Sequence, residues 1–170
     1  GAQAFSSFDT YLSPFVHKYM NELSQDLDKE GCVFSSEDKK REYIKKEAQY
    51  YTLQQMLNFV FGLNVPSRWG TQTPFTNITL DWSCPEDLRE QSLHLGGYDA
   101  GKYHKTYGEL DEERKIINQA LLQVYAEWDY KWRAFTFPIP TYNITEDFPW
   151  QSEDVNPIFD VTAKYGLPYF

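Results

Sequence analysis

The first third of the chain carries the apolar spacing of two long helices. Between residues 8 and 29, apolar side chains recur at every third or fourth position and form one stripe along a helix. The stripe consists of Phe8, Leu12, Phe15, Tyr19, Leu23 and Leu27. Pro14 lies inside this pattern, so the helix either kinks there or begins after Ser13 with Pro14 in its first turn. Gly31 fits the end of the helix.

A second helix is expected over residues 37–62. Ser36 can cap its first turn, and Gly62, Asn64 and Pro66 favour its end. The early turns carry a basic run that is made of Lys39, Lys40, Arg41, Lys45 and Lys46. Such a run is either a solvated helix face or a patch that binds phosphate groups.

The rest of the chain shows strand and helix patterns in turn. Residues 75–82 alternate as a strand does, and residues 110–132 show helical spacing. The buried face of that helix is predicted to contain Ile117, Ala120, Leu121, Val124 and Trp128. A second strand over residues 134–145 contains two prolines, and a short helix over residues 157–165 ends at Gly166. A strand–helix–strand unit with a long crossover is parallel, which predicts an α/β protein with two leading helices.

Composition and charge exclude several classes of protein. Aromatic residues make up 18% of the 170 residues, which is enough apolar material for a packed core. The net charge of −9 disfavours unaided binding to nucleic acid or to an anionic membrane. No run approaches the roughly 20 apolar residues of a membrane span. We therefore expect a cytoplasmic protein that binds neither nucleic acid nor membrane. The absence of a starting Met and the apolar last residues predict that both ends continue in a longer chain.

Candidate metal ligands and reactive thiols are few. Cys32 and Cys84 have no second Cys or His at metal-ligand spacing, which predicts two free thiols and no metal site. Cys84 follows the first strand, in an irregular polar segment. His17, His94 and His104 are scattered along the chain and are expected at ordinary surface positions.

The loop over residues 66–77 is dense in hydroxyl and amide side chains. It is either a tight connector packed by Arg68 and Trp69 or a ligand-binding loop that leads into a buried strand. On the helix before it, three tyrosines are interleaved with or follow the basic run, and they are suited to stacking on a nucleobase. These are Tyr43, Tyr50 and Tyr51.

The same loop resembles the anaerobic, class III ribonucleotide reductases. The resemblance rests on Pro66-Ser67-Arg68-Trp69-Gly70 followed by Gln72-Thr73-Pro74-Phe75-Thr76-Asn77. Three further segments agree with this family in the same order, and together they span nearly the whole chain. They are Ala2 to Asp9, Ile139 to Thr145 and Thr162 to Phe170. The two motifs of the loop argue against a relative of formate lyase, which is another glycyl radical enzyme.

The resemblance implies a section of an α/β barrel that is built from two parallel half-sheets. Members of this family reduce ribonucleoside triphosphates to deoxyribonucleotides with formate or a thiol system as reductant. A radical-SAM partner installs a glycyl radical, which generates a transient thiyl radical on a cysteine. The radical glycine, the catalytic cysteines and a zinc site are expected outside this stretch. No catalytic role is therefore carried over to Cys32 or Cys84, and the chain alone is expected to be inactive.

The resemblance places a homodimer contact and an allosteric site in this stretch. Residues 1–62 would supply helices that bind ATP or a deoxynucleoside triphosphate as effector, and residues 63–170 a strand–helix–strand part of the barrel, within one partial domain. The expected effector ligands are Asp9 for the ribose hydroxyl, Lys39, Lys45 and Lys46 for the phosphates, and Tyr50. The expected substrate-side residues are Gln72, Thr73, Thr76 and Asn77. The rival hypothesis is a stand-alone, non-catalytic nucleotide-binding or regulatory module that lost the chemistry.

Overall fold

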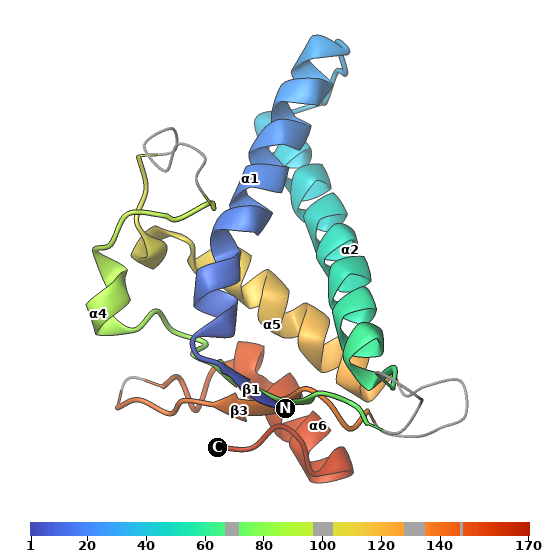
Figure 1. The fold of residues 1–170 in the computed structure, drawn as a ribbon. Helices are drawn as coiled ribbons and strands as arrows, with labels where there is room; N and C mark the ends of the chain where they lie inside the picture. The colour runs from blue at the N-terminus through green and yellow to red at the C-terminus, as the bar shows by residue number, and fades with distance from the viewer. Residues whose placement is uncertain (67–71, 97–103, 128–134, 147) are drawn as a thin grey trace.

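Three strands form a small parallel sheet, and the long helices lie on one side of it (Figure 1). The computed structural model describes residues 1–66, 72–96, 104–127, 135–146 and 148–170. The elements are β1 (Ala2–Phe5), α1 (Phe8–Lys29), α2 (Glu37–Asn64), β2 (Phe75–Leu80), α4 (Glu86–Arg89), α5 (Asp111–Ala126), β3 (Ile139–Tyr142) and α6 (Asn156–Tyr165), with short 3₁₀ turns at Tyr107–Glu109 and Glu153–Val155. The mixed α/β class is as predicted.

The sheet contains one strand more than the sequence pattern predicts. Its order is β1-β2-β3, and both pairings are parallel, with Ala4 opposite Asn77 and Thr79 opposite Thr141. The parallel pair of β2 and β3 is confirmed, whereas the expected number of two strands is wrong. All four residues of β1 are exposed, so no alternation of buried and exposed positions marks them as a strand. Their conformation depends on pairing with β2, which lies far along the chain.

The first helix runs without interruption through its proline. α1 begins at Phe8, so the earlier of the two expected starts is confirmed. Pro14 has no backbone N–H to donate to the carbonyl of Thr10. The hydroxyl of Ser13 donates to that carbonyl instead, at 2.8 Å, and all three residues are buried. The side chain of Ser13 thus satisfies the acceptor that the proline leaves unpaired.

If the Ser13 hydroxyl replaces the N–H that Pro14 lacks, the effects of mutating Ser13 and Pro14 depend on each other. We expect Ser13→Ala to lower the free energy of unfolding by about 1–3 kcal/mol, since it leaves a buried carbonyl unpaired. In a Pro14→Ala background, where the backbone N–H is restored, the same change is expected to cost well under 1 kcal/mol. Urea unfolding of the four proteins measures the coupling. Equal costs in both backgrounds would show that the hydroxyl does not replace the missing N–H.

The second helix has the predicted cap and a slightly later end. The side chain of Ser36 accepts a hydrogen bond from the backbone N–H of Lys39 at 3.2 Å. The helix continues to Asn64, two residues beyond the predicted end. The Asn64 side chain donates to the carbonyls of Val60 and Phe137 and accepts from the N–H of Phe137. It thereby ties the end of α2 to the segment that leads into β3.

The helix α5 lies at the centre of the packing and confirms its predicted face. Of the five residues predicted to be buried, four are at most 5% exposed, and Trp128 lies outside the described residues, as does the predicted helix end near residue 132. Further residues around the helix are also buried, because α1 and α2 pack on one side of it and α6 packs against another. They include Glu113, Arg114, Ile116, Asn118, Leu122 and Tyr125.

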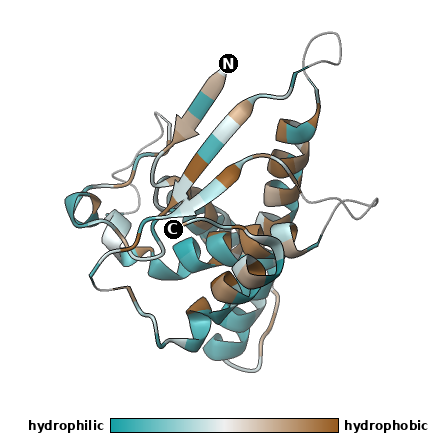
Figure 2. Ribbon diagram, turned by 90° about the horizontal axis from the view of Figure 1, so that it is seen from below, coloured by the Kyte–Doolittle hydropathy of each residue, from teal (hydrophilic) through white to brown (hydrophobic). Residues whose placement is uncertain are grey.

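The helices α1, α2 and α5 lie over one face of the sheet. Ile78 and Leu80 of β2 point into the core that these helices share, and they are 0% and 1% exposed. Asn77 and Thr79 alternate with them and are only partly buried. These two side chains lie on the opposite face of the sheet, which Figure 2 views directly. The described part of the chain places no helix in front of the three strands there. A parallel sheet that is covered on one face only is unusual, because parallel sheets are normally buried on both.

Candidate functional site

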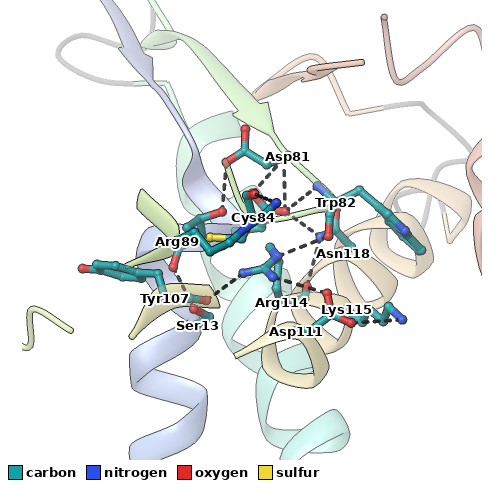
Figure 3. A network of polar contacts seen from close by, with 12 residues as sticks. Ser13, Asp81, Trp82, Cys84, Arg89, Tyr107, Asp111, Arg114, Lys115 and Asn118 are labelled. Atoms are coloured by element: carbon teal, nitrogen blue, oxygen red, sulfur yellow. Dashed lines mark hydrogen bonds and ion pairs between the residues drawn. The ribbon is translucent and has the colours of Figure 1, made fainter. Parts of the chain in front are cut away.

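A buried polar network joins the carboxyl end of β2 to the helices α1 and α5 (Figure 3). Its centre is Asp81, which directly follows β2 and is 4% exposed. The Asp81 carboxylate accepts hydrogen bonds from the hydroxyl of Thr10 at 2.9 Å and from the side-chain amide of Asn143 at 2.8 Å. The network therefore connects the beginning of α1 with the ends of β2 and β3. In α/β proteins, ligands bind near the carboxyl ends of parallel strands.

The second carboxylate of this network, Asp9, is completely buried. It accepts hydrogen bonds from the backbone N–H groups of Asp81, at 3.0 Å, and Trp82, at 3.1 Å. The side-chain amide of Asn118 donates to it at 2.8 Å, and Asn118 in turn accepts from the hydroxyl of Tyr142 at 2.6 Å. Burial and the nearby charge of Asp81 raise the pKa of Asp9 to about 6, although the three hydrogen bonds oppose this rise.

The placement of Asp9 differs from the expectation that it meets an effector ribose. Its acceptors are directed at backbone and side-chain donors of the same chain, and its exposed fraction is 0%. The family resemblance suggested the ribose contact from the position of Asp9 near the start of the first helix. The tertiary packing buries the first turn of this helix against the end of β2. We therefore do not assign Asp9 to a ligand.

A buried arginine holds the same junction together. Arg114 on α5 is 1% exposed, and its guanidinium donates to the backbone carbonyl of Trp82 at 3.2 Å and to that of Tyr107 at 3.3 Å. It also contacts the carboxylate of Asp111 at 3.3 Å. Figure 3 shows this side chain between the segment after β2 and the turn before α5. Arg114 thus holds the backbone after β2 and before α5, where no strand pairing fixes the carbonyls of Trp82 and Tyr107.

The helix-free face of the sheet carries a second polar group of side chains. Asn77, Thr79 and Thr141 lie on this face, and Thr79 stands opposite Thr141 in the register. The hydroxyl of Thr79 accepts a hydrogen bond from the backbone N–H of Ser7 at 2.9 Å. The side-chain oxygen of Asn77 is buried and has no hydrogen-bond partner among the described residues. An unpaired buried acceptor is uncommon and suggests that a further group meets this face.

The four expected substrate-side residues do not share one face of the sheet, and two of them, Gln72 and Thr73, precede β2. Thr76 is 0% exposed on the helix-covered face, and its hydroxyl donates to the carbonyl of Pro74 at 3.2 Å. Asn77 is on the opposite, helix-free face, while Gln72 is exposed and Thr73 partly buried. The loop precedes β2 and so lies at the amino end of the strand, whereas α/β ligand sites lie at the carboxyl ends. Residues 67–71, which carry most of the first motif, lie outside the described residues.

The four expected effector residues of α2 are all exposed but point in two directions. Lys39, Lys46 and Tyr50 fall on one outer stripe of the helix, with Lys46 two turns after Lys39 and Tyr50 one turn after Lys46. Tyr50 is 64% exposed. Lys39 is paired with Glu42 at 2.6 Å. Lys45 is on another side of the helix, where it contacts Glu112 of α5 at 2.8 Å. The structure therefore groups three of these residues and separates the fourth.

Comparison with known families agrees with the resemblance in sequence. The sequence model of one family, described as anaerobic ribonucleoside-triphosphate reductase, matches residues 1–170. The chain belongs to this family. A search of curated proteins gives no match. Family membership makes the protein a ribonucleotide reductase, which is an oxidoreductase, of the anaerobic kind.

The two cysteines of this anaerobic reductase chain differ in environment. Cys84 is 8% exposed and packs in a small apolar cluster with Leu88, Leu93, Tyr107 and Leu110. Burial raises the pKa of the Cys84 thiol, which disfavours the reactive thiolate. Cys32 is exposed between α1 and α2. Both are free thiols, as predicted.

The structure also bears on the expectations for the histidines, for metal binding and for membrane spans in the reductase chain. His17 is not an ordinary surface residue, because its Nδ1 lies 2.6 Å from the Glu113 carboxylate and the two side chains are 12% and 8% exposed. Within the described ranges, no group of three His, Cys, Asp or Glu side chains is arranged to hold a metal ion. None of the described helices is long and apolar enough to cross a membrane.

Most members of the buried network were not identifiable from the reductase sequence. Asp81, Arg114 and Asn118 lie in three separate segments and belong to no local motif. Arg114 and Asn118 are one helical turn apart on α5, yet charged and amide residues at such spacing usually face solvent. The predicted burial of Ile117 and Leu121 on the same helix was the one available indication that their neighbours lie near the core.

Proposed function

We propose that this chain forms part of the catalytic barrel wall of an anaerobic ribonucleoside-triphosphate reductase. The observation that carries the proposal is the parallel sheet with helices on one face only. In an α/β barrel the helices form an outer ring and the opposite face of the strands lines the interior. The exposed face of this sheet would then face the substrate cavity, which explains why no helix covers it and why it carries Asn77, Thr79 and Thr141.

The side chains of the helix-free face suit contact with a polar substrate. Asn77 offers an unpaired buried oxygen, and Thr79 and Thr141 offer hydroxyl groups beside each other. Ribose hydroxyls and phosphate oxygens both form hydrogen bonds with amide and hydroxyl groups. We assign the substrate-side role to Asn77 among the four expected residues, since Thr76 points into the core. The thiyl and glycyl radical chemistry is not assigned to any residue of this chain.

The long helices α1 and α2 are proposed to form a dimer contact. Large side chains are exposed along both helices, although such residues are usually buried in the core. They are Tyr11, Phe15, Tyr43, Tyr50, Tyr51 and Phe61, each at least 41% exposed. Aromatic side chains are enriched at the centres of protein interfaces. A second copy of the same chain is the proposed partner, in a cytoplasmic enzyme.

The outer stripe of α2 is the proposed phosphate contact of a nucleotide effector. Lys39 and Lys46 supply positive charge there, and Tyr50 supplies an exposed ring. Lys45 is not on this stripe and already contacts Glu112. The proposed effector is ATP or a deoxynucleoside triphosphate. Replacement of the charged or aromatic side chains of this stripe therefore tests the proposal directly.

Calorimetric titration with dATP, dTTP, dGTP and ATP tests this proposal, together with the mass of the protein in solution. We expect saturable binding of at least one nucleotide by a dimer. Lys46→Ala is expected to weaken binding roughly ten-fold, because a hydrogen bond to a charged group contributes about 1.5–3 kcal/mol. The matched control is Lys29→Ala, which removes an exposed lysine at the far end of α1 that pairs with Asp26. A monomer that binds none of the four nucleotides would contradict the proposal.

A further inference from the structure

The chain makes a strained turn around Trp82, directly after β2. The backbone N–H of Ser83 donates to the carbonyl of Asp81 at 2.6 Å, and Trp82 between them has a φ of 58°. A three-residue turn with a positive φ at its centre is the rare and strained form of the γ-turn. A positive φ is an outlier for a bulky residue, and Trp82 is 2% exposed. Such strain persists only where the surrounding structure enforces it, and it is concentrated at sites that bind or switch.

Two charged side chains from different helices hold this turn in place (Figure 3). The N–H of Trp82 donates to the carboxylate of Asp9 on α1 at 3.1 Å, and its carbonyl accepts from the guanidinium of Arg114 on α5 at 3.2 Å. Asp9 also accepts from the N–H of Asp81 at 3.0 Å. Hydrogen bonds to charged groups are roughly twice as strong as those between neutral groups. The turn is therefore held firmly as long as both side chains keep their charge.

Of these two charges, that of Asp9 changes within the ordinary pH range. Arg114 keeps its proton under all such conditions. Burial and the charge of Asp81 raise the pKa of Asp9 to about 6. Cys84, which follows β2, and Tyr142 of β3 also interact electrostatically with Asp9. Burial raises the pKa of both groups, so they stay neutral at pH 7.5 and below and leave the charge on Asp9 to respond to acid.

We propose that the turn at Trp82 is a proton-controlled switch, which the ionised Asp9 carboxylate holds closed and which opens when Asp9 is protonated. A protonated carboxyl group carries no charge, and its hydroxyl is a donor, so it accepts less strongly from the N–H groups of the turn. Trp82 then leaves the left-handed region, because the release of strain favours this movement.

The open turn changes what the end of β2 contacts. Asp81 belongs to the turn, and its carboxylate accepts from the hydroxyl of Thr10 on α1 and from the amide of Asn143 after β3. When the turn opens, Asp81 moves away from both donors. Acidification thereby uncouples the start of α1 and the end of β3 from the end of β2. This switch is a property of the chain itself and does not depend on the proposed reductase function.

Amide hydrogen exchange of the purified chain at pH 5.5 and pH 7.5 tests the switch. After correction for the intrinsic pH dependence of exchange, we expect the protection of the Trp82 amide to be roughly ten-fold lower at pH 5.5, since it loses a hydrogen bond to a charged group. The amides within β2, which pairs with a strand on each side, should keep their protection. Equal protection of the Trp82 amide at both pH values would overturn the proposal.

Asp9→Asn separates the proton on Asp9 from other effects of pH. The variant has no charge at this position at any pH, so we expect the Trp82 amide to be weakly protected at pH 7.5 as well. The matched control is Asp38→Asn, because Asp38 is the second residue of α2, as Asp9 is of α1, but is exposed. This control should keep the pH dependence of the wild type. Protection of the Trp82 amide at the wild-type level in Asp9→Asn at pH 7.5 would show that the carboxylate does not hold the turn.

A comparison of Trp82→Gly with Trp82→Ala tests the strain, because both variants lose the ring. We expect the folding equilibrium constant of Trp82→Gly to exceed that of Trp82→Ala by about five-fold or more, since glycine adopts a positive φ without steric cost. The same pair of changes at Gln49, an exposed position inside α2, is the control and should give the opposite order. A more stable alanine variant at both positions would contradict the strain and with it the switch.

Discussion

Replacement of Arg114 by methionine is expected to lower the free energy of unfolding by about 3 kcal/mol. The guanidinium is 1% exposed and donates to two buried backbone carbonyls, those of Trp82 and Tyr107. Methionine fills much of the same volume but donates no hydrogen bond, and each buried acceptor left unpaired costs roughly 1–3 kcal/mol. The removal of a buried charge offsets part of this loss, because the charge itself is costly to desolvate. We expect the carbonyls to dominate, since the backbone around them is fixed.

Urea unfolding at pH 7 measures this effect, with Arg41→Met as the matched control. Arg41 is exposed, and no ion pair or hydrogen bond of its side chain occurs within the described ranges, so its replacement is expected to change stability by less than about 0.5 kcal/mol. Arg114→Lys keeps the charge but not the planar set of donors, so its loss of stability should lie between those of Arg114→Met and Arg41→Met. A change below 1 kcal/mol in Arg114→Met would show that the carbonyls find other donors.

The second large expected effect is a dependence of stability on pH that comes from Asp9. Burial and the charge of Asp81 raise the pKa of Asp9 from 3.8 to about 6 in the folded protein. The folded state therefore holds a proton between pH 4 and pH 6 that the unfolded state releases. The stabilisation is fully present below pH 4 and is lost as the pH rises through 6. The difference of about two pKa units corresponds to about 3 kcal/mol.

Asp9→Asn isolates this contribution from that of the other carboxylates. The variant has no titratable group at this position, so the stability of the wild type relative to it should fall by about 2.5 kcal/mol between pH 4 and pH 7.5. The amide of the variant also meets N–H donors from Asp81 and Trp82, which lowers its stability at every pH without changing the slope. Asp26→Asn, at an exposed carboxylate near the far end of α1, is the control and should keep the wild-type slope. Parallel curves for wild type and Asp9→Asn would refute the raised pKa.

These two predictions concern the same junction, and together they bear on the proposed barrel. Asp9, Asp81 and Arg114 hold the start of α1 and the end of β2 in place with hydrogen bonds inside the chain. The position of Thr79 and Asn77 on the helix-free face depends on that junction, because both residues belong to the strand that it anchors. Loss of stability at the junction should therefore precede loss of order on the face proposed to meet substrate.

The sequence alone determined the long helices and the family, but not the short helix α4 in the segment it expected to be irregular. The helical spacing predicted α1, the buried face of α5 and, with Gly166, the end of α6. Ser36 predicted the cap of α2. These features depend on neighbouring residues, since helical hydrogen bonds and caps connect positions at most a few residues apart. The motifs of the loop and of three further segments indicated the anaerobic reductases, and the family match over residues 1–170 confirms them.

Only the tertiary structure decided which residues are buried at the foot of α1 and which strand completes the sheet. The predicted apolar stripe of α1 is only partly buried, with Phe15 50% exposed, while the polar residues Asp9 and Thr10 are fully buried. β1 forms only because β2 pairs with it, and the helix-free face exists only because α1, α2 and α5 lie on the same side. Both outcomes depend on contacts between residues far apart in the chain. Local patterns of hydrophobic and polar residues do not encode such contacts, because they specify which face of an element is apolar but not what packs against it.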